Sequence, residues 1–219
     1  MQAIIFDMDG VLVDNQDIHR KAWVEFCRRI GHPIDPADFD RVGFGRKNKE
    51  FLRYFLQREV SGQEAKILGE KKEAVYRELA GKEIQPVNGL IPFLRSMKKE
   101  YHLKTAVASS APRSNIDFVL KKLLIGEFFD VLADASLVDQ GKPHPSIYLK
   151  TAELLDLPPA QCLVFEDSLF GVESALQAGM QVVALTTSHS YKELSAYPCR
   201  DIIRDFSELN EEKMQKLIR

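Results

Sequence analysis

The sequence has 219 residues, of which 45% are hydrophobic and 28% are charged, and its formal net charge is −2. This length suits one domain or one and a half, and the apolar fraction is ordinary for a soluble globular protein. The charge favours neither a nucleic acid nor a membrane as a partner, and no apolar run approaches the roughly 20 residues of a membrane-spanning helix.

The three cysteines, Cys27, Cys162 and Cys199, lie far apart in the sequence. Their odd number and wide spacing match neither a disulfide framework nor a metal site, which suits a reducing compartment. A strand pattern begins at residue 3, so we expect no signal peptide. These features predict a cytoplasmic protein.

A short apolar run at residues 3–7 predicts a buried parallel strand. The run ends in two acids, Asp7 and Asp9, followed by Gly10. Two carboxylates this close repel each other unless a cation or a shared proton is present, and glycine allows a sharp turn beside them. The pattern favours an aspartate nucleophile with a partner acid and a metal ion.

The next stretch, residues 15–83, contains helical patterns and no convincing strand. Helices are expected at 16–30, at 48–58, and from the capping-box pattern at Ser61 to about Leu79, ending at Gly81. A glycine-rich, basic loop is expected at 42–49. This stretch therefore predicts a small helical domain inserted directly after the first strand.

Strands and helices alternate from residue 84 to the end of the chain. Expected strands are 104–108, 129–132, 162–165, 181–185 and 201–203, and expected helices are 89–100, 113–123, one ending near Leu155, 169–178 and 207–217. Alternation of this kind predicts a parallel sheet with right-handed crossovers. The predicted fold class is α/β, with a doubly wound, Rossmann-like core at 1–14 and 84–219 and a helical cap at 15–83.

Three of the expected strands end in polar residues, namely Asp7 and Asp9, Ser109 and Ser110, and Glu166 and Asp167. Carboxyl ends of parallel strands meet at one edge of a sheet, where ligands bind. Clustered acids need a cation, and oxygen ligands without Cys or His select a hard ion, for which Mg²⁺ is the obvious choice. Lys142, before a proline, adds a positive charge on an extended loop. Together these groups suit a phosphoryl substrate.

Four segments resemble the four motifs of the haloacid dehalogenase-type phosphotransferase superfamily: Asp7-Met8-Asp9-Gly10-Val11, Ser109, Lys142 in Gly-Lys-Pro-His-Pro, and Glu166-Asp167. The resemblance implies that Asp7 attacks phosphorus and that Asp9 protonates the leaving oxygen and later activates water. It implies that Ser109, with Ser110 beside it, and Lys142 hold the phosphoryl oxygens. It also implies that Asp7, the backbone carbonyl of Asp9, Asp167 and, directly or through water, Glu166 bind Mg²⁺.

The cap position resembles the subclass that includes β-phosphoglucomutase and small sugar-phosphate phosphatases. His19 and Trp23 resemble cap residues that face the site there, Gly45-Arg46 resembles a loop that grips a second phosphate, and Lys72 falls where another polar contact lies. The alternatives are that His19 lies at a core edge, that Trp23 packs in the cap core, and that Arg46 and Lys72 are solvated.

One departure concerns the segment after Ser109. The mutases carry Ser-Lys-Asn there, whereas this chain reads Ser109-Ser110-Ala111-Pro112-Arg113. The sequence therefore favours a Mg²⁺-dependent phosphatase acting on a small phosphorylated metabolite, with the protein as a monomer. The alternatives are a β-phosphoglucomutase and a non-catalytic binding protein that kept the fold.

Overall fold

The computed structural model describes residues 1–37, 39 and 48–219, and the chain divides into two compact units. The first, called the core unit below, comprises Met1–Asp14 and Gln85–Arg219. The second, the helical unit, comprises Asn15–Ile84.

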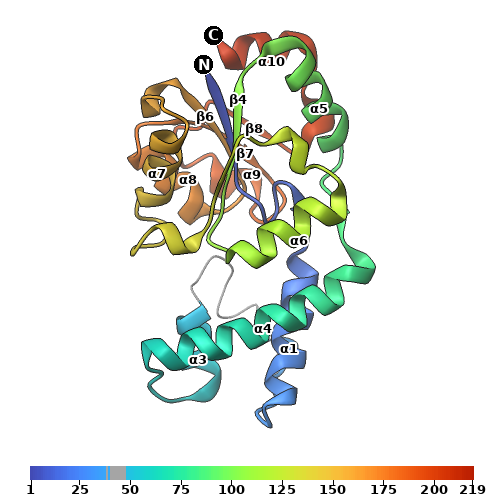
Figure 1. Ribbon diagram of the computed structural model, residues 1–219, viewed down its shortest axis with the longest axis vertical. Helices are drawn as coiled ribbons and strands as arrows, with labels where there is room; N and C mark the ends of the chain where they lie inside the picture. The colour runs from blue at the N-terminus through green and yellow to red at the C-terminus, as the bar shows by residue number, and fades with distance from the viewer. Residues whose placement is uncertain (38, 40–47) are drawn as a thin grey trace. The chain divides into compact units, whose positions relative to one another are not determined.

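A six-stranded parallel sheet forms the centre of the core unit, in the order β5-β4-β1-β6-β7-β8 (Figure 1). Its strands are β1 (Ala3–Phe6), β4 (Lys104–Ala108), β5 (Val131–Ala133), β6 (Cys162–Glu166), β7 (Gln181–Leu185) and β8 (Asp201–Ile203). The chain adds β4 and β5 on one side of β1, and then β6 to β8 on the other. Strand β1 therefore lies at the point where the strand order reverses, and ligands bind at such a point in open α/β sheets.

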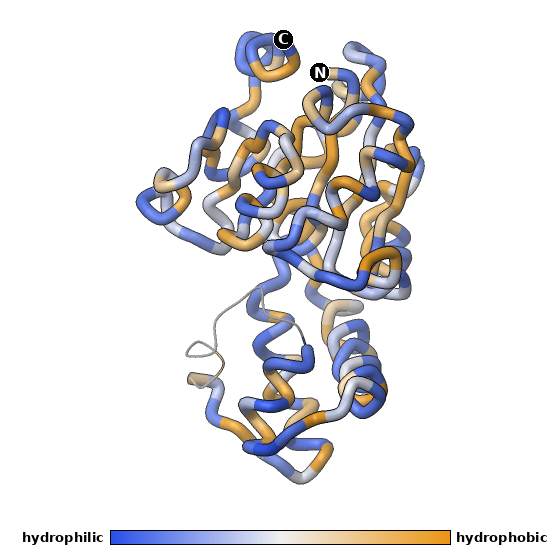
Figure 2. Tube along the Cα trace, turned by 90° about the vertical axis from the view of Figure 1, so that its left-hand side faces the viewer, coloured by the Kyte–Doolittle hydropathy of each residue, from blue (hydrophilic) through white to orange (hydrophobic). Residues whose placement is uncertain are grey.

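Helices cover both faces of this sheet, which confirms the predicted doubly wound core. On one side lie α7 (Ser146–Leu154) and α8 (Leu169–Gln177), and on the other α5 (Leu90–Ser96), α6 (Arg113–Leu123) and α10 (Glu211–Ile218) (Figure 1). The face toward α7 and α8 is rich in buried alanines, which let the helices approach closely. Hydrophobic segments run through the core unit among hydrophilic ones (Figure 2).

The opposite face of the sheet carries a cluster of aromatic rings. The Phe6 ring stacks on Phe165 with centroids 5.3 Å apart, and Phe206 lies 5.2 Å from Phe165. Both Phe6 and Phe165 are fully buried. Phe6 directly precedes Asp7, and Phe165 directly precedes Glu166. The packing of the two rings therefore fixes the strand ends from which the polar side chains project.

The helical unit contains α1 (Gln16–Arg29), α3 (Asn48–Leu56) and α4 (Gly62–Glu83). Two ion pairs show that α1 and α4 run antiparallel. Lys21 pairs with Glu83 at the end of α4 at 2.8 Å, and Arg29, further along α1, pairs with Glu78, earlier in α4, at 2.9 Å. Trp23 packs against Phe51 and Phe55, with ring centroids 5.0 and 5.7 Å apart. This unit therefore has an aromatic core of its own.

A short antiparallel pair, β2 (Val13–Asp14) and β3 (Gln85–Pro86), joins the two chain segments of the core unit. Val13 pairs with Pro86, and Asp14 with Gln85. Two residues are too short a run for hydrophobic periodicity to detect, so the sequence patterns did not predict this pair.

The remaining short elements of the described chain are α9 (Tyr191–Leu194), a π-helical turn at Met97–Tyr101, and 3₁₀ turns. The 3₁₀ turns lie at Gly126–Phe128, Ala135–Leu137, Pro159–Gln161 and Phe206–Glu208.

Several predicted helix ends were wrong, among them the end of the helix 48–58, which stops at Leu56. Helix α4 continues past Gly81 to Glu83, since the buried Ala80 and the Lys21–Glu83 ion pair hold its last turn against α1. The predicted helix 207–217 is divided, because Asn210 breaks it and accepts a hydrogen bond from the Lys213 backbone N–H as the N-cap of α10.

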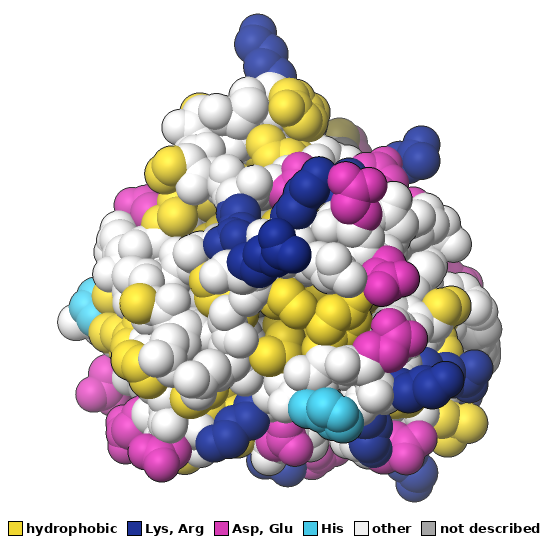
Figure 3. All heavy atoms as spheres, turned by 90° about the horizontal axis from the view of Figure 1, so that it is seen from above, with side chains coloured by type: hydrophobic (Ala, Val, Ile, Leu, Met, Phe, Trp, Pro, Cys, Tyr) yellow, Lys and Arg dark blue, Asp and Glu magenta, His cyan; other side chains and the backbone are white. Residues whose placement is uncertain are grey.

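Within the described ranges, no helix is both long and apolar enough to cross a membrane. On the face shown in Figure 3, acidic side chains lie beside basic ones around a group of hydrophobic side chains. Ion pairs such as Lys216–Glu212, at 2.7 Å, illustrate this mixing of charges. The surface seen there is not dominated by one sign of charge.

Candidate active site

Asp7, Ser109 and Asp167 each follow directly on one of three adjacent strands, β1, β4 and β6. The parallel register pairs Phe6 with Phe165, so β1 and β6 end at the same edge. The Asp7 backbone N–H continues the ladder by donating to the Phe165 carbonyl at 3.0 Å. The predicted convergence of these strand ends is therefore present in the structure.

Lys142 reaches this edge from the loop before α7. Its ammonium Nζ lies 2.6 Å from Asp7 Oδ1 and 2.6 Å from Glu166 Oε1. The Ala108 carbonyl, one residue before Ser109, is 3.4 Å from the same nitrogen. The Lys142 side chain is only 7% exposed, and its peptide bond to Pro143 is cis. One buried ammonium thus links the ends of β1, β4 and β6.

Glu166 is completely buried, and protein donors satisfy both of its carboxylate oxygens. Oε1 accepts from Lys142 Nζ and from the Tyr148 hydroxyl, the latter at 2.9 Å. Oε2 accepts from the backbone N–H groups of Asp167 and Ser168, at 2.8 and 2.9 Å, and from Ser168 Oγ at 3.1 Å. A β-carbon at Gly171 would lie 1.7 Å from Oε1, so the carboxylate rests directly against α8.

Asp167 points to the opposite side from Glu166, as neighbours on an extended segment do. A β-carbon at Gly10 would lie 1.9 Å from Asp167 Oδ2, so only glycine leaves room for this carboxylate. The Ser188 hydroxyl donates to the same oxygen. The Thr187 hydroxyl donates its single proton to the Gly10 carbonyl at 2.6 Å, and its oxygen lies 3.4 Å from Asp167 Oδ2. The turn after β1 is therefore fitted to Asp167.

Burial dominates the electrostatics of these acids. It raises the pKa of Asp7 to about 7, with Glu166 and Asp9 adding to the effect and Lys142 opposing it. Burial, followed by the charges of Glu166 and Asp7, raises the pKa of Asp167 well above its usual range.

The two partners inside the ion pair respond differently. Burial raises the pKa of Glu166, but the charge and hydrogen bond of Lys142 outweigh it and leave the pKa below its ordinary value. Burial lowers the pKa of Lys142, yet Asp7 and Glu166 raise it well above normal. One buried cation thus faces three buried carboxyl groups, and since the pKa values of Asp7 and Asp167 are raised, a further cation would favour their charged forms.

The donor set fits Mg²⁺, which takes oxygen ligands and commonly binds only one or two carboxylates with several waters. Asp7 and Asp167 are 7% and 3% exposed and supply two such carboxylates. No three acidic, imidazole or thiol groups of the described residues converge as around a metal ion, and Glu166 is instead turned toward Lys142 and backbone N–H groups.

The other predicted residues of the core unit occupy different environments. Asp9 is partly exposed in the turn, where the Gly10 N–H donates to the Val13 carbonyl at 2.8 Å. Ser109 is 1% exposed, and its hydroxyl accepts from the Ala111 N–H at 3.1 Å. Ser110 is exposed. Ser109 directly follows Ala108, whose carbonyl contacts Lys142. It is therefore closer along the chain to the buried ion pair than Ser110 is.

Three predicted cap residues lie together within the helical unit. Lys72 Nζ is 3.0 Å from His19 Nδ1, 3.0 Å from Glu73 Oε1 and 5.3 Å from the Trp23 ring centroid. Lys72 and Trp23 are each 2% exposed. Gly45 and Arg46 lie outside the described residues. Whether these residues meet a substrate stays a prediction.

Sequence patterns missed three residues that line these acids: Tyr148, Thr187 and Ser188. Thr187 and Ser188 follow β7, a fourth strand whose end is followed by hydroxyl residues. The rule that polar residues after parallel strands gather at one edge of the sheet could have found them. Tyr148 gave no signal, because a tyrosine among apolar residues of a helix is indistinguishable from ordinary core.

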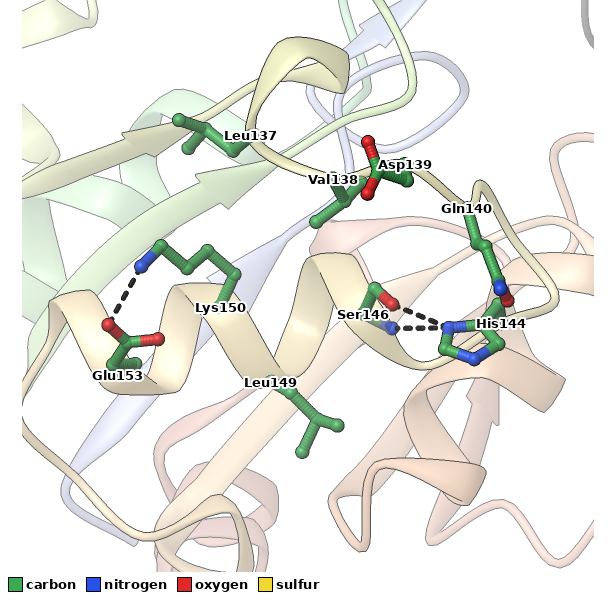
Figure 4. A pocket seen from close by; sticks show the side chains of 9 residues that line it. All are labelled: Leu137, Val138, Asp139, Gln140, His144, Ser146, Leu149, Lys150 and Glu153. Carbon is green, nitrogen blue, oxygen red and sulfur yellow. Dashed lines mark hydrogen bonds and ion pairs between the residues drawn. The ribbon is translucent and has the colours of Figure 1, made fainter.

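A separate pocket of about 420 Å³ lies along α7 and the preceding loop (Figure 4). Its lining includes Leu137, His144, Leu149 and Lys150. None of the strand-end acids lines it. The pocket therefore belongs to the outer surface of α7, where Lys150 pairs with Glu153 at 2.7 Å.

Comparison with known proteins gave concordant results. A family model described as haloacid dehalogenase-like hydrolase matches residues 1–179. The chain is 34% identical to a phosphorylated carbohydrates phosphatase of Thermotoga maritima, covering 83% of each protein. It is 32% identical to the β-phosphoglucomutase of Bacillus subtilis, over 84% of this chain and 83% of that protein. A crystal structure from Entamoeba histolytica, described as a HAD hydrolase of family IA, variant 3, superposes with a TM-score of 0.90 and 32% identity over 100% of this chain and 99% of that chain.

Proposed function

The chain belongs to the haloacid dehalogenase-like hydrolase family, and we propose that it is a Mg²⁺-dependent phosphatase of a sugar phosphate, acting through an aspartyl-phosphate on Asp7. The observation that carries this proposal is the buried Asp7 carboxylate held at 2.6 Å by Lys142 at the strand-order reversal. The similarity to a phosphatase of phosphorylated carbohydrates supports the substrate class.

In the first half-reaction, an Asp7 carboxylate oxygen attacks phosphorus and the bond from phosphorus to the leaving oxygen breaks. Asp9 donates a proton to that leaving oxygen, and its partly exposed position on the turn leaves its carboxyl open to a substrate. Lys142 and Ser109 hold the phosphoryl oxygens, where negative charge is concentrated during transfer.

In the second half-reaction, water attacks the phosphorus of the aspartyl-phosphate. Asp9 now accepts the proton of that water, the bond from Asp7 to phosphorus breaks, and inorganic phosphate leaves. Asp7 is regenerated as a carboxylate, which the adjacent Lys142 ammonium stabilises.

Asp7, Asp167 and the backbone carbonyl of Asp9 are the groups that would hold Mg²⁺. When bound, the ion offsets negative charge on the phosphoryl group. Glu166 serves this site through Lys142, since protein donors already satisfy both of its oxygens.

The helical unit is proposed as a cap that selects the leaving group and closes over the substrate. The protein is proposed to act as a monomer. The cluster of Lys72, His19 and Trp23 supports this role, because a lysine and a histidine are side chains that hydrogen-bond to sugar hydroxyls. Closure of such a unit would exclude water from the reacting phosphorus.

Asp7→Asn tests the mechanism. The variant should lose turnover of phosphomonoesters in a metabolite screen, while circular dichroism shows an unchanged fold, because asparagine is nearly isosteric with aspartate. Asp156→Asn is the matched control, since Asp156 is exposed and has a φ of +55°, a conformation that asparagine tolerates. Retained turnover in Asp7→Asn would exclude the aspartyl-phosphate.

The second candidate is a β-phosphoglucomutase, favoured by the 32% identity to the Bacillus subtilis enzyme. Against it, Arg113, which stands near the missing Lys-Asn element, pairs with Asp117 at 2.8 Å on α6. ³¹P NMR with β-glucose 1-phosphate and a bisphosphate primer separates the two. Net release of phosphate supports the phosphatase, whereas conversion to glucose 6-phosphate without release supports the mutase.

A further inference from the structure

Tyr148 is a buried residue of α7 that the proposed reaction does not use. It is fully buried, and its hydroxyl donates to Glu166 Oε1 at 2.9 Å. The face of α7 around Leu149 and Lys150 is turned away, toward the outer pocket (Figure 4). Tyr148 is therefore on the side of the helix that packs against the buried acids.

The hydroxyl of Tyr148 and the ammonium of Lys142 share one acceptor. Both donate to Oε1 of Glu166, which fixes the tyrosine and the lysine relative to each other. The Lys142 nitrogen also lies 4.9 Å from the centroid of the Tyr148 ring, within the range of a cation–π contact. Tyr148 is thus linked to Lys142 in two ways, through the shared Glu166 oxygen and through its own ring.

The Glu166 carboxylate is restrained on its other side by α8. A β-carbon at Gly171 would lie 1.7 Å from Oε1 and 2.3 Å from Oε2, so the carboxylate rests on the helix backbone. Oε2 is held by the N–H groups of Asp167 and Ser168, directly before α8. On the side toward α7, the carboxylate is contacted by the Tyr148 hydroxyl.

We propose that Tyr148 is a positioning residue that holds the Lys142 ammonium against Asp7. This inference rests on the proposed function for its kinetic consequence. Interactions with a lysine that contacts the nucleophile count most in the transition state, where charge is transferred. Loss of Tyr148 should therefore lower kcat more than it changes KM.

The test compares Tyr148→Phe, Tyr148→Leu and the control Thr151→Val. The first removes the hydroxyl and keeps the ring, and the second removes both. Thr151 lies on the same helix, is fully buried, and donates its hydroxyl to the Ile147 carbonyl at 2.7 Å, so its variant loses a buried hydrogen bond without touching the site. Hydrolysis of p-nitrophenyl phosphate with Mg²⁺ gives kcat and KM.

We expect kcat to fall about tenfold in Tyr148→Phe, since a hydrogen bond to a charged group is worth roughly that factor, and further in Tyr148→Leu. KM should change less than about threefold, and Thr151→Val should behave as wild type. Equal losses in Thr151→Val, or a wild-type kcat in Tyr148→Phe, would overturn the proposal.

A second readout does not need turnover. Acetylation of Lys142 by an N-hydroxysuccinimide ester, measured by mass spectrometry relative to the exposed Lys121, reports how firmly the ammonium is held. The ratio should rise severalfold in Tyr148→Phe and stay unchanged in Thr151→Val. If the wild-type protein hydrolyses no phosphomonoester, the proposed function fails, and this ratio alone supports or refutes the role of Tyr148.

Discussion

Gly10→Ala tests whether the turn after β1 is shaped by Asp167. Gly10 has a φ of +80°, and an added β-carbon would lie 1.9 Å from Asp167 Oδ2. Gly179 has nearly the same φ, +78°, and nothing lies within 4 Å of its β-carbon position. The pair therefore separates the cost of the backbone conformation from the cost of displacing the carboxylate.

The magnitudes follow from these contacts. A non-glycine residue in the left-handed region costs about 1 kcal/mol, so Gly179→Ala should lower the free energy of unfolding by about that amount. In Gly10→Ala, Oδ2 must move from 1.9 Å to at least 3.0 Å from the β-carbon, which disrupts its hydrogen bond from Ser188. A bond to a carboxylate contributes about 1.5 kcal/mol, so with the backbone cost the total loss should be about 2.5 kcal/mol.

The assay is urea unfolding followed by far-ultraviolet circular dichroism, with the free energy obtained by linear extrapolation. Trp23 is the only tryptophan and lies in the helical unit, so its fluorescence reports that unit separately. Both variants should leave the fluorescence transition unchanged. Equal destabilisation of the core by the two substitutions would refute the close fit of Gly10 to Asp167.

Two further predictions concern buried charges. Without metal, Asp167→Asn should raise the free energy of unfolding by about 1 kcal/mol, because it removes a buried carboxylate beside Glu166 and Asp7. Mg²⁺ at 100 times its Kd should stabilise the wild type by roughly 2.7 kcal/mol, and Asp167→Asn should abolish this effect. Unfolding in Mg²⁺ and in EDTA checks this, and equal stabilisation of both proteins by Mg²⁺ would contradict it. Lys72→Met should lower the stability of the helical unit by about 3 kcal/mol, since it removes the ammonium that lies 3.0 Å from the buried Glu73 carboxylate. Lys72→Met with Glu73→Gln should recover part of that loss. Trp23 fluorescence during urea unfolding measures both, and a single variant as stable as the double one would disprove the coupling.

The fold and the chain positions of the acidic residues were readable from the sequence because each rests on a local pattern. Short apolar runs mark β1, β4 and β6, and the polar residue after each run marks its end. Since parallel strands share an edge, Asp7, Ser109 and Asp167 could be brought together without knowing any side-chain contact.

The different environments of Glu166 and Asp167 could not be predicted in the same way. Both are acids at one strand end, and their side chains go to opposite sides of the extended backbone. Only the contacts from distant parts of the chain, Lys142 and Tyr148 on one side and Ser188 on the other, distinguish them. For the same reason the sequence offered no sign that Lys72 is buried beside Glu73, since long-range packing decides burial.

The pairing of Asp14 with Gln85 has a consequence for how the chain folds. Strand β1 must find β4, and Ala3 pairs with Lys104 across a long intervening segment. Antiparallel packing of α1 and α4 brings the two ends of the helical unit together, as the Lys21–Glu83 contact shows. If this unit forms early, the effective loop between β1 and β4 shrinks from about 100 to about 30 residues, which lowers the entropic barrier to closing it by about 1 kcal/mol. In that case the inserted helices would speed assembly of the sheet by shortening the loop that must close between β1 and β4.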